Sequence, residues 1–222
     1  MQKDDFIKLA NEGNSRVSIS KVIRNIDASP LDTYKKLERK NSFLFESGSN
    51  KGKWSRYSII GTTSNERIKV TGNLIKYVDG ENTEEFQADD PLNWIENFYN
   101  DNKVKNLPKD LPFTGGLVGY FGYETIQFIE NKIQVNKKDS LGVPDIFLFV
   151  CNEIIIFDNK ENVVHIVLNE RTNKKDSYES AIKRIDNLEK IIKQKTASKN
   201  YKNSFPKDSF SSSFKKENFL NA

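Results

Sequence analysis

Apolar and polar residues alternate along much of the chain, which is the period-two pattern of half-buried β-strands. Turn residues separate several of these runs. Thr71-Gly72-Asn73 predicts a hairpin over residues 67–78, and residues 158–162 predict another between two apolar runs. The pattern predicts about nine strands, at residues 17–23, 42–46 and 56–60, two within 67–78, and further ones at 113–123, 145–150, 153–157 and 163–168.

Other segments carry apolar residues at helical spacing. Ser29-Pro30 and Asp90-Pro91 each place a capping side chain before a proline at the first helical position, which is a strong signal for a helix start. The pattern predicts a short helix over residues 4–11, a helix from Pro30 to about Lys40, another from Pro91, and a long helix over residues 176–196.

The composition narrows the class of protein. Charged residues make up 30% of the chain, but 15 Phe and 8 Tyr argue against general disorder. A net charge of +4 with both signs mixed is not typical of a nucleic-acid-binding protein. The single cysteine, Cys151, cannot form an intrachain disulfide and suits a reducing compartment such as the cytoplasm. Residues 1–6 lack the apolar core of a signal peptide, and the longest apolar stretch, residues 146–151, is too short to span a membrane.

The composition changes after the long helix, and this change predicts the domain organisation. We expect one domain over residues 1–196, followed by a Ser/Lys/Asn-rich linker over residues 197–213. A new helical pattern begins at Phe214 and stops with the chain at Ala222. A helix cut off in its second turn buries almost nothing, so we expect residues 214–222 to begin a further, truncated domain.

A group of polar residues lies where two predicted strands face each other across a loop. Glu46 and Ser47 end the first strand, and Arg56 begins the second. A carboxylate can hold an ammonium group, and a hydroxyl with a guanidinium can hold a carboxylate, so the set suits an amino-acid ligand. The alternative is a solvated hairpin end with a surface ion pair, which contributes only ~0–1 kcal/mol.

Three further features have simple structural interpretations. The segment FTGGLVGYFGYE, residues 113–124, lacks the Lys-Ser/Thr pair of a phosphate-binding loop, and its glycines predict a crowded strand at a contact between sheets. His165 is the only histidine and has no cysteine partners for a zinc site. Cys151 follows an apolar run and is expected to act as a small apolar residue. No motif supplies a complete catalytic set.

Together these segments resemble one known family. SFLFESGSNKGKWSRYSIIG, residues 42–61, is similar to the N-terminal signature of anthranilate synthase component I, in which Leu-Leu-Glu-Ser precedes a loop and an Arg-Tyr-Ser run. PFTGGLVGYFGYE and VPDIFLFVCNEIIIFD resemble the next two elements of that family, in the same order. The resemblance extends from Val17 to about Leu188, and the last residues resemble the family's entry into its chorismate-binding domain.

The resemblance implies a fold and a function. The family fold is α+β, with antiparallel β-sheets packed face to face and helices on the outside. The family converts chorismate and ammonia to anthranilate in tryptophan biosynthesis. A glutamine amidotransferase, component II, releases the ammonia. The chorismate and Mg²⁺ sites belong to the downstream domain, so this segment is expected to contain no catalytic residues.

The resemblance also implies an allosteric pocket for L-tryptophan, the feedback inhibitor. At the matching positions this chain has Leu44, Glu46, Ser47 and Arg56, and Phe45 replaces the usual leucine. Phe45 and Tyr57 are further candidates for the wall around the indole. Two alternatives stay open: component I of 4-amino-4-deoxychorismate synthase, which shares the architecture, and a non-catalytic amino-acid-binding module.

Overall fold

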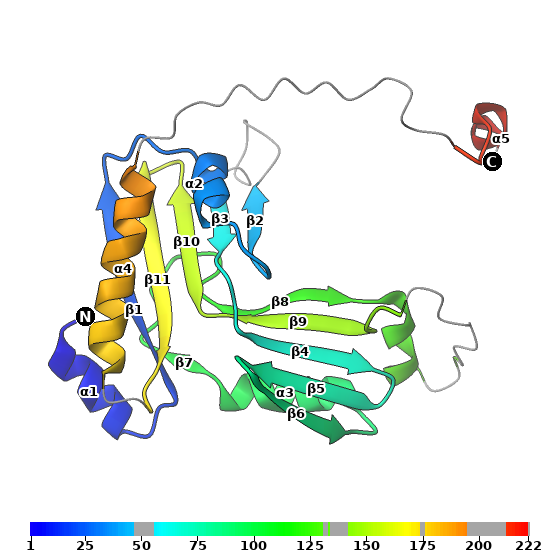
Figure 1. Ribbon diagram of the computed structural model, residues 1–222, viewed down its shortest axis with the longest axis horizontal. Coiled ribbons are helices and arrows are strands. Elements are labelled where there is room, and N and C mark those ends of the chain that lie inside the picture. Colours follow the sequence, from blue (N-terminus) through cyan, green and yellow to red (C-terminus); the bar gives the residue numbers. More distant parts are fainter. Residues whose placement is uncertain (47–55, 131–132, 134–141, 174–175, 195–211, 222) are drawn as a thin grey trace.

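The chain folds into two mainly antiparallel sheets with helices on their outer faces, as a computed structural model shows (Figure 1). The structure describes residues 1–46, 56–130, 133, 142–173, 176–194 and 212–221. This architecture confirms the predicted α+β class with antiparallel sheets. Among the described residues, no helix is both long and apolar enough to cross a membrane.

The first sheet has six strands in the order β2-β3-β10-β11-β1-β7. All of its pairs are antiparallel except β1 with β7, which is parallel. Its strands are β1 (Arg16–Arg24), β2 (Phe43–Glu46), β3 (Tyr57–Gly61), β7 (Val104–Lys105), β10 (Glu153–Asp158) and β11 (Val163–Arg171).

The second sheet has five strands in the order β6-β5-β4-β9-β8, and all of its pairs are antiparallel. Its strands are β4 (Glu66–Thr71), β5 (Leu74–Asp79), β6 (Asn82–Gln87), β8 (Gly116–Phe121) and β9 (Ile146–Cys151). In Figure 1 its strands run across the direction of those in the first sheet.

The helices cover one face of each sheet. In the first sheet, residues of α1 (Lys3–Asn11), α2 (Pro30–Leu37) and α4 (Ser177–Lys193) share one apolar cluster with alternate residues of the central strands, including Ile155 and Ile166. In the second sheet, α3 (Pro91–Asp101) packs against the face that carries Ile68 and Leu148.

The opposite face of the first sheet packs against the second sheet. Ile154, Ile156 and Val167 alternate with the residues of the helix-covered face, and they form a cluster with Phe149 and Cys151 of β9. The six-stranded sheet is therefore buried on both faces, and its central strands are almost entirely apolar for that reason.

The predicted local signals mostly agree with the structure. The Ser29 hydroxyl accepts from the Asp32 N–H, and the Asp90 carboxylate accepts from the Asn93 N–H, so both predicted caps are confirmed. The predicted end of the second helix at Lys40 is wrong, because Glu38 is already extended (ψ 125°) and α2 stops at Leu37.

Several short elements were not predicted. β6 has a single apolar residue, Phe86, because it is an exposed edge strand. β7 has two residues, too few to show a period. A 3₁₀ segment over Tyr123–Phe128 was also not predicted, whereas the five-residue α5 (Lys216–Leu220) agrees with the helical pattern that begins at Phe214. The predicted linker lies outside the described residues except for its last two positions, so the domain boundaries stay a prediction.

The glycine-rich strand is crowded, as predicted. A Cβ on Gly119 would lie 1.9 Å from the carbonyl oxygen of Phe147 on the neighbouring strand. A Cβ on Gly115, just before β8, would lie 2.1 Å from Nδ2 of Asn169 in the other sheet. Gly119 therefore lets the paired strand of its own sheet approach closely, and Gly115 leaves room for the Asn169 side chain where the sheets meet.

Candidate functional site

The described residues predicted to bind a ligand lie at the ends of β2 and β3, which are paired at the edge of the first sheet. Glu46 is the last residue of β2 and lies opposite Ser58 of β3. Arg56 comes immediately before β3. The sheet therefore brings Glu46 and Arg56 to one end of two neighbouring strands. Ser47 lies outside the described residues.

The side chains beside this end divide between the two faces of the sheet. Leu44 is half-buried and packs against the helix-covered cluster. Phe45 lies on the face opposite to Leu44, together with Phe43 and Tyr57. It is 54% exposed, and its ring centre lies 4.5 Å from that of Phe43. A ligand that approaches one face of the sheet would therefore contact either Leu44 or the pair Phe45 and Tyr57.

Arg56 is held by a carboxylate that the sequence analysis did not single out. Its Nε lies 2.9 Å from Oδ1 of Asp158, and its Nη2 lies 2.6 Å from Oδ2. Asp158 is only 3% exposed and also accepts from the N–H groups of Lys160 and Glu161. Its hydrogen bonds with Arg56 are the largest cause that holds the pKa of Asp158 below its usual value. A bidentate pair of this kind fixes both the position and the plane of the guanidinium.

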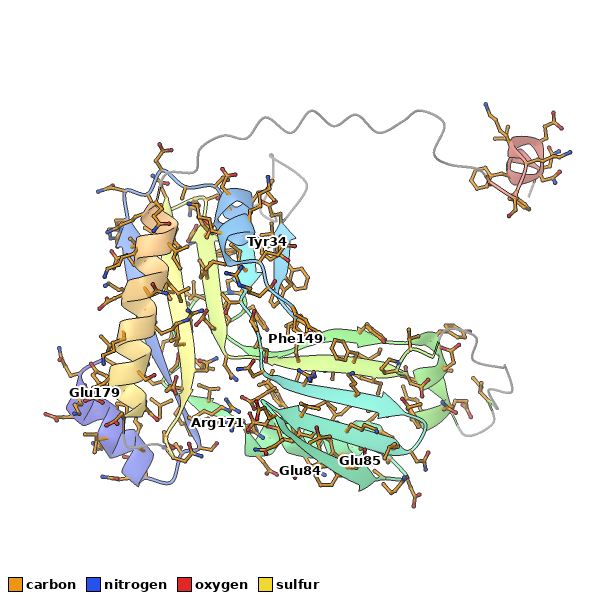
Figure 2. The ribbon with its side chains drawn as sticks, in the orientation of Figure 1. Tyr34, Glu84, Glu85, Phe149, Arg171 and Glu179 are labelled. Atoms are coloured by element: carbon orange, nitrogen blue, oxygen red, sulfur yellow. The ribbon has the colours of Figure 1, made fainter. Side chains whose placement is uncertain are left out.

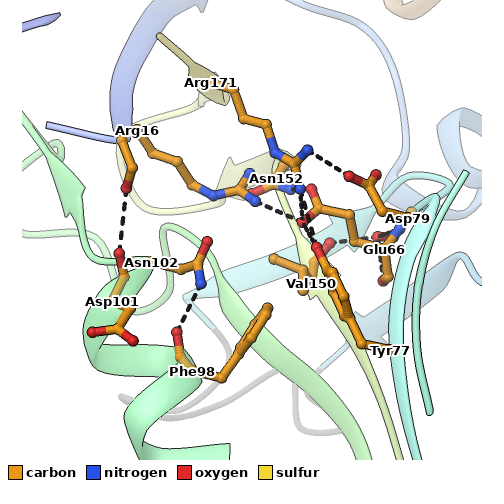
Figure 3. A network of polar contacts seen from close by, with 12 residues as sticks. Arg16, Glu66, Tyr77, Asp79, Phe98, Asp101, Asn102, Val150, Asn152 and Arg171 are labelled. Atoms are coloured by element: carbon orange, nitrogen blue, oxygen red, sulfur yellow. Dashed lines mark hydrogen bonds and ion pairs between the residues drawn. The ribbon is translucent and has the colours of Figure 1, made fainter. Parts of the chain in front are cut away.

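A second polar group joins the two sheets (Figure 3). Glu66, at the start of β4, is buried and accepts from two arginines of the other sheet. Its Oε2 lies 2.6 Å from Nη2 of Arg16 and 2.6 Å from Nη2 of Arg171. Tyr77 donates to the same oxygen at 2.9 Å, and Asn152 donates to Oε1 at 2.9 Å. The carboxylate thus links two strands of the first sheet to the second.

The charges in this group perturb their neighbours. Burial raises the pKa of Tyr77 to about 12, and the negative charge of Glu66 adds to the effect. Burial disfavours the charged form of Arg171, but hydrogen bonds with Asp79 and the charge of Glu66 outweigh it, so the net pKa shift is upward. Arg171 therefore stays ionised, and Tyr77 stays protonated, at neutral pH.

Sequence reasoning missed this group because its members are far apart in the chain. Arg16 is 50 residues from Glu66, and Arg171 is 105 residues away. The only feature of the sequence that could have indicated this group is weak: charged residues stand at the ends of apolar strands. That pattern is typical of solvent-exposed strand ends, and only the pairing of the sheets shows that these ends are buried.

The remaining candidates have structural roles. Cys151 is buried between the sheets, and burial raises its pKa to about 12, so the thiol is a small apolar residue as expected. His165 is half-buried on β11, where burial lowers its pKa. In the part of the chain that the structure describes, no group of three or more His, Cys, Asp or Glu side chains gathers to hold a metal ion.

Comparison with known proteins identifies the family. Residues 40–222 match the sequence model of a protein family that is described as chorismate binding enzyme. The chain belongs to that family. The match covers most of the chain and includes the strand-end residues Glu46 and Arg56.

Individual relatives carry a more specific name. Anthranilate synthase component 1 of Pseudomonas putida is 34% identical over 198 residues, which are 87% of this chain and 40% of that protein. The protein of the same name from Neisseria meningitidis serogroup B is 33% identical over 204 residues, which are 89% of this chain and 41% of that protein. The chain thus spans about 40% of the length of the curated relatives it matches.

A solved structure agrees with the fold. The crystal structure of anthranilate synthase component I from Streptococcus pneumoniae superposes with a TM-score of 0.53 and covers 79% of this chain and 38% of that chain. At 23% sequence identity, this likeness supports the fold alone.

The buried carboxylate at the junction generates the first prediction. Glu66→Ala leaves the guanidinium of Arg16, which is 2% exposed, without its partner. Removing one member of a buried ion pair costs ~3–5 kcal/mol, so we expect a loss of that size in the free energy of unfolding. Urea unfolding followed by circular dichroism measures it.

The matched control is Glu84→Ala, which removes an exposed carboxylate of β6 (Figure 2). It should change the free energy of unfolding by no more than ~0.5 kcal/mol. If the two variants lose the same stability, the junction does not hold the sheets together.

The second prediction concerns pH. Because the pKa of Asp158 is lower in the folded chain than in the unfolded one, its contribution to stability is fully present above about pH 4. That contribution is lost as the pH falls through the folded value. Asp158→Asn should therefore be less stable than the wild type at pH 7, and the difference should shrink below about pH 4.

Unfolding curves in urea at several pH values between 2 and 7 measure this difference. Asp89→Asn, which neutralises an exposed carboxylate, is the control. A difference between Asp158→Asn and the wild type that stays constant down to pH 2 would show that the pair with Arg56 does not depend on ionisation.

Proposed function

We propose that this chain is the N-terminal, regulatory part of an anthranilate synthase component I. The observation that carries the proposal is the name shared by relatives that are 32–35% identical over most of this chain. The complete enzyme would convert chorismate and ammonia to anthranilate in tryptophan biosynthesis, in the cytoplasm. The ammonia would come from glutamine through a component II amidotransferase.

The proposed regulatory ligand is L-tryptophan, held by Leu44, Glu46, Ser47 and Arg56. Free tryptophan carries an ammonium group, a carboxylate and an indole ring. Glu46 would bind the ammonium, and Ser47 and Arg56 would bind the carboxylate. The fixed guanidinium of Arg56 supports this role, because a preorganised group loses little entropy when a ligand binds.

Inhibition would follow from a change in the arrangement of domains. A ligand shifts such an equilibrium only when it binds one arrangement better than the other. Tryptophan at the ends of β2 and β3 would favour an arrangement in which chorismate binds poorly. By linkage, chorismate would weaken tryptophan binding by the same factor.

The catalytic site and its Mg²⁺ are proposed to belong to the part of the enzyme beyond this chain. Exposed apolar side chains on β8, the edge strand of the second sheet, support this assignment. Tyr120 is 41% exposed and Phe121 is 54% exposed, and exposed apolar surfaces commonly contact a partner.

Two other functions predict different products or binding behaviour for the complete protein. Component I of 4-amino-4-deoxychorismate synthase would yield an aminodeoxychorismate product from the same substrate. A non-catalytic module would bind tryptophan without any chorismate chemistry in the complete protein. The names of the relatives favour anthranilate synthase over both.

The third prediction tests the division of roles. The 222-residue chain, incubated with chorismate, Mg²⁺ and ammonium, should form no anthranilate, whereas the complete enzyme should form it under the same conditions. Anthranilate fluorescence and chromatography of the products measure both reactions. Reproducible turnover by the purified chain would place catalytic residues within it, and an aminodeoxychorismate product would favour the alternative enzyme.

The fourth prediction tests the regulatory site. Ser47→Phe should fill the proposed pocket and remove a hydrogen bond, so the tryptophan concentration for half inhibition of the complete enzyme should rise at least roughly tenfold. The turnover number without tryptophan should be retained, because chorismate binds in the other part. Steady-state assays over a range of tryptophan concentrations measure both quantities.

The control for this variant is Ser20→Phe, which adds the same ring at an exposed position of β1. It should leave the inhibition curve unchanged. An unchanged curve for Ser47→Phe as well would rule out the proposed pocket. Loss of activity without tryptophan would instead make Ser47 a structural residue.

A further inference from the structure

Asp158 lies behind Arg56 rather than at the surface where a ligand would arrive. Its side chain is 3% exposed, whereas the side chain of Arg56 is 36% exposed. A ligand at the ends of β2 and β3 would therefore meet the guanidinium and not the carboxylate that holds it. Any effect of Asp158 on such a ligand has to pass through Arg56.

The carboxylate of Asp158 is fixed from its own side. Asp158 is the last residue of β10 and lies opposite Tyr57 of β3. Its Oδ1 accepts from the backbone N–H groups of Lys160 and Glu161 at 3.0 and 3.2 Å. Both N–H groups belong to the turn between β10 and β11, so the carboxylate has anchors other than Arg56.

Arg56 is tied to the same turn through its backbone. Its carbonyl oxygen accepts from the N–H of Asn159 at 2.8 Å, which continues the pairing of β3 with β10. At the other end of the side chain, the guanidinium carbon lies 4.8 Å from the centre of the Tyr57 ring. The sheet, the carboxylate and the aromatic ring together restrict a long side chain to few rotamers.

These contacts also decide on which face of the sheet the guanidinium lies. Arg56 precedes Tyr57, so the alternation of a strand would direct its side chain to the face opposite to the Tyr57 ring. The guanidinium instead lies over that ring and against Asp158, which is the cross-strand partner of Tyr57. The bonds with Asp158 therefore hold the positive charge on the face that carries Tyr57 and Phe45.

The pair leaves one edge of the guanidinium for another acceptor. Of its five N–H donors, one on Nε and one on Nη2 point to the carboxylate of Asp158. The other three, two on Nη1 and one on Nη2, lie in the same plane and point away from Asp158. A second carboxylate can accept from Nη1 and Nη2 side by side, in a direction that is defined as long as that plane is held.

We propose that Asp158 is the positioning residue of the tryptophan site. It presents the Nη1–Nη2 edge of Arg56 to the ligand carboxylate, on the face of Tyr57, and touches no ligand atom itself. This inference rests on the proposed function, because it takes tryptophan to bind at Arg56. The competing role is a structural one, in which the pair only ties the start of β3 to the turn after β10.

The fifth prediction separates orientation from charge. Asp158→Asn removes a negative charge near the ligand carboxylate, and this change by itself would tighten binding. It also releases the guanidinium, which must then be ordered when the ligand binds. We expect the second effect to dominate, so the dissociation constant of L-tryptophan for the complete enzyme should rise about threefold to tenfold. Isothermal titration calorimetry at pH 7 measures it, and unfolding midpoints check that the variant is folded.

The matched control is Glu161→Gln, which changes charge without changing the pair. Glu161 is exposed, and its negative charge also favours the ionised form of Arg56. The backbone N–H that Glu161 donates to Asp158 is kept in the variant. Glu161→Gln should therefore not weaken tryptophan binding.

A double-mutant cycle tests whether Asp158 acts through Arg56. Arg56→Gln removes the donor edge and should weaken tryptophan binding. Adding Asp158→Asn to Arg56→Gln should cause no further loss, because no guanidinium remains to be oriented. A purely structural pair would instead lower the unfolding midpoint of Asp158→Asn and leave its dissociation constant unchanged.

The proposal is overturned if folded Asp158→Asn binds L-tryptophan as tightly as the wild type or more tightly. It is also overturned if Glu161→Gln weakens binding as much, or if Asp158→Asn causes the same loss with and without Arg56. If Asp158→Asn does not fold, Arg56→Lys replaces it, because lysine keeps the charge but lacks the planar fork. An unchanged dissociation constant for Arg56→Lys would then overturn the proposal.

The same measurements distinguish this inference from the proposed function. If the wild-type enzyme does not bind L-tryptophan, both are wrong. If Ser47→Phe weakens inhibition as expected while Asp158→Asn binds as the wild type does, the regulatory site stands and only the positioning role of Asp158 is rejected.

Discussion

The carboxylate of Glu66 is the interaction on which the arrangement of the two sheets depends. It is buried, and it accepts from Arg16 and Arg171 of the six-stranded sheet while its own strand belongs to the five-stranded sheet. Without it, Arg16 would lose this ion pair, and Arg171 would retain its contacts with Asp79 and Tyr77. Charged groups can be buried here only because each has a partner of opposite sign, and that requirement fixes how one sheet meets the other.

The chain connectivity explains why the junction is polar. β9 ends at Cys151 and β10 begins at Glu153, so Asn152 alone carries the chain from one sheet to the other. Strands that change sheets form the corners between crossing sheets, and their backbone and side-chain groups need partners there. Asn152 donates to Glu66, and Ser64, on the connection from β3 to β4, donates to the carbonyl oxygen of Val150. The apolar cluster around Phe149 then fills the angle between the faces.

Two arginines at the ends of strands are each held by a buried carboxylate from another segment. At the ends of β2 and β3, Arg56 is held by the buried carboxylate of Asp158. Beside the junction, Arg16 is held by Glu66. In each case a carboxylate from a distant segment fixes the guanidinium in a defined orientation. Strand ends suit this arrangement because the bodies of the strands are needed for the core.

The sequence by itself determined the local elements and the family. Ser29 and Asp90 cap their helices through neighbours three residues away, and the hairpin turns need only residues that are adjacent in the chain. The signature segments were likewise contiguous, and the family match confirmed the family that they indicated. Only the tertiary structure decided the partners of Glu66 and Arg56 and the faces to which Leu44 and Phe45 belong. These features join residues that are 50 to 105 positions apart or depend on which side of a sheet is covered, and no local pattern records either.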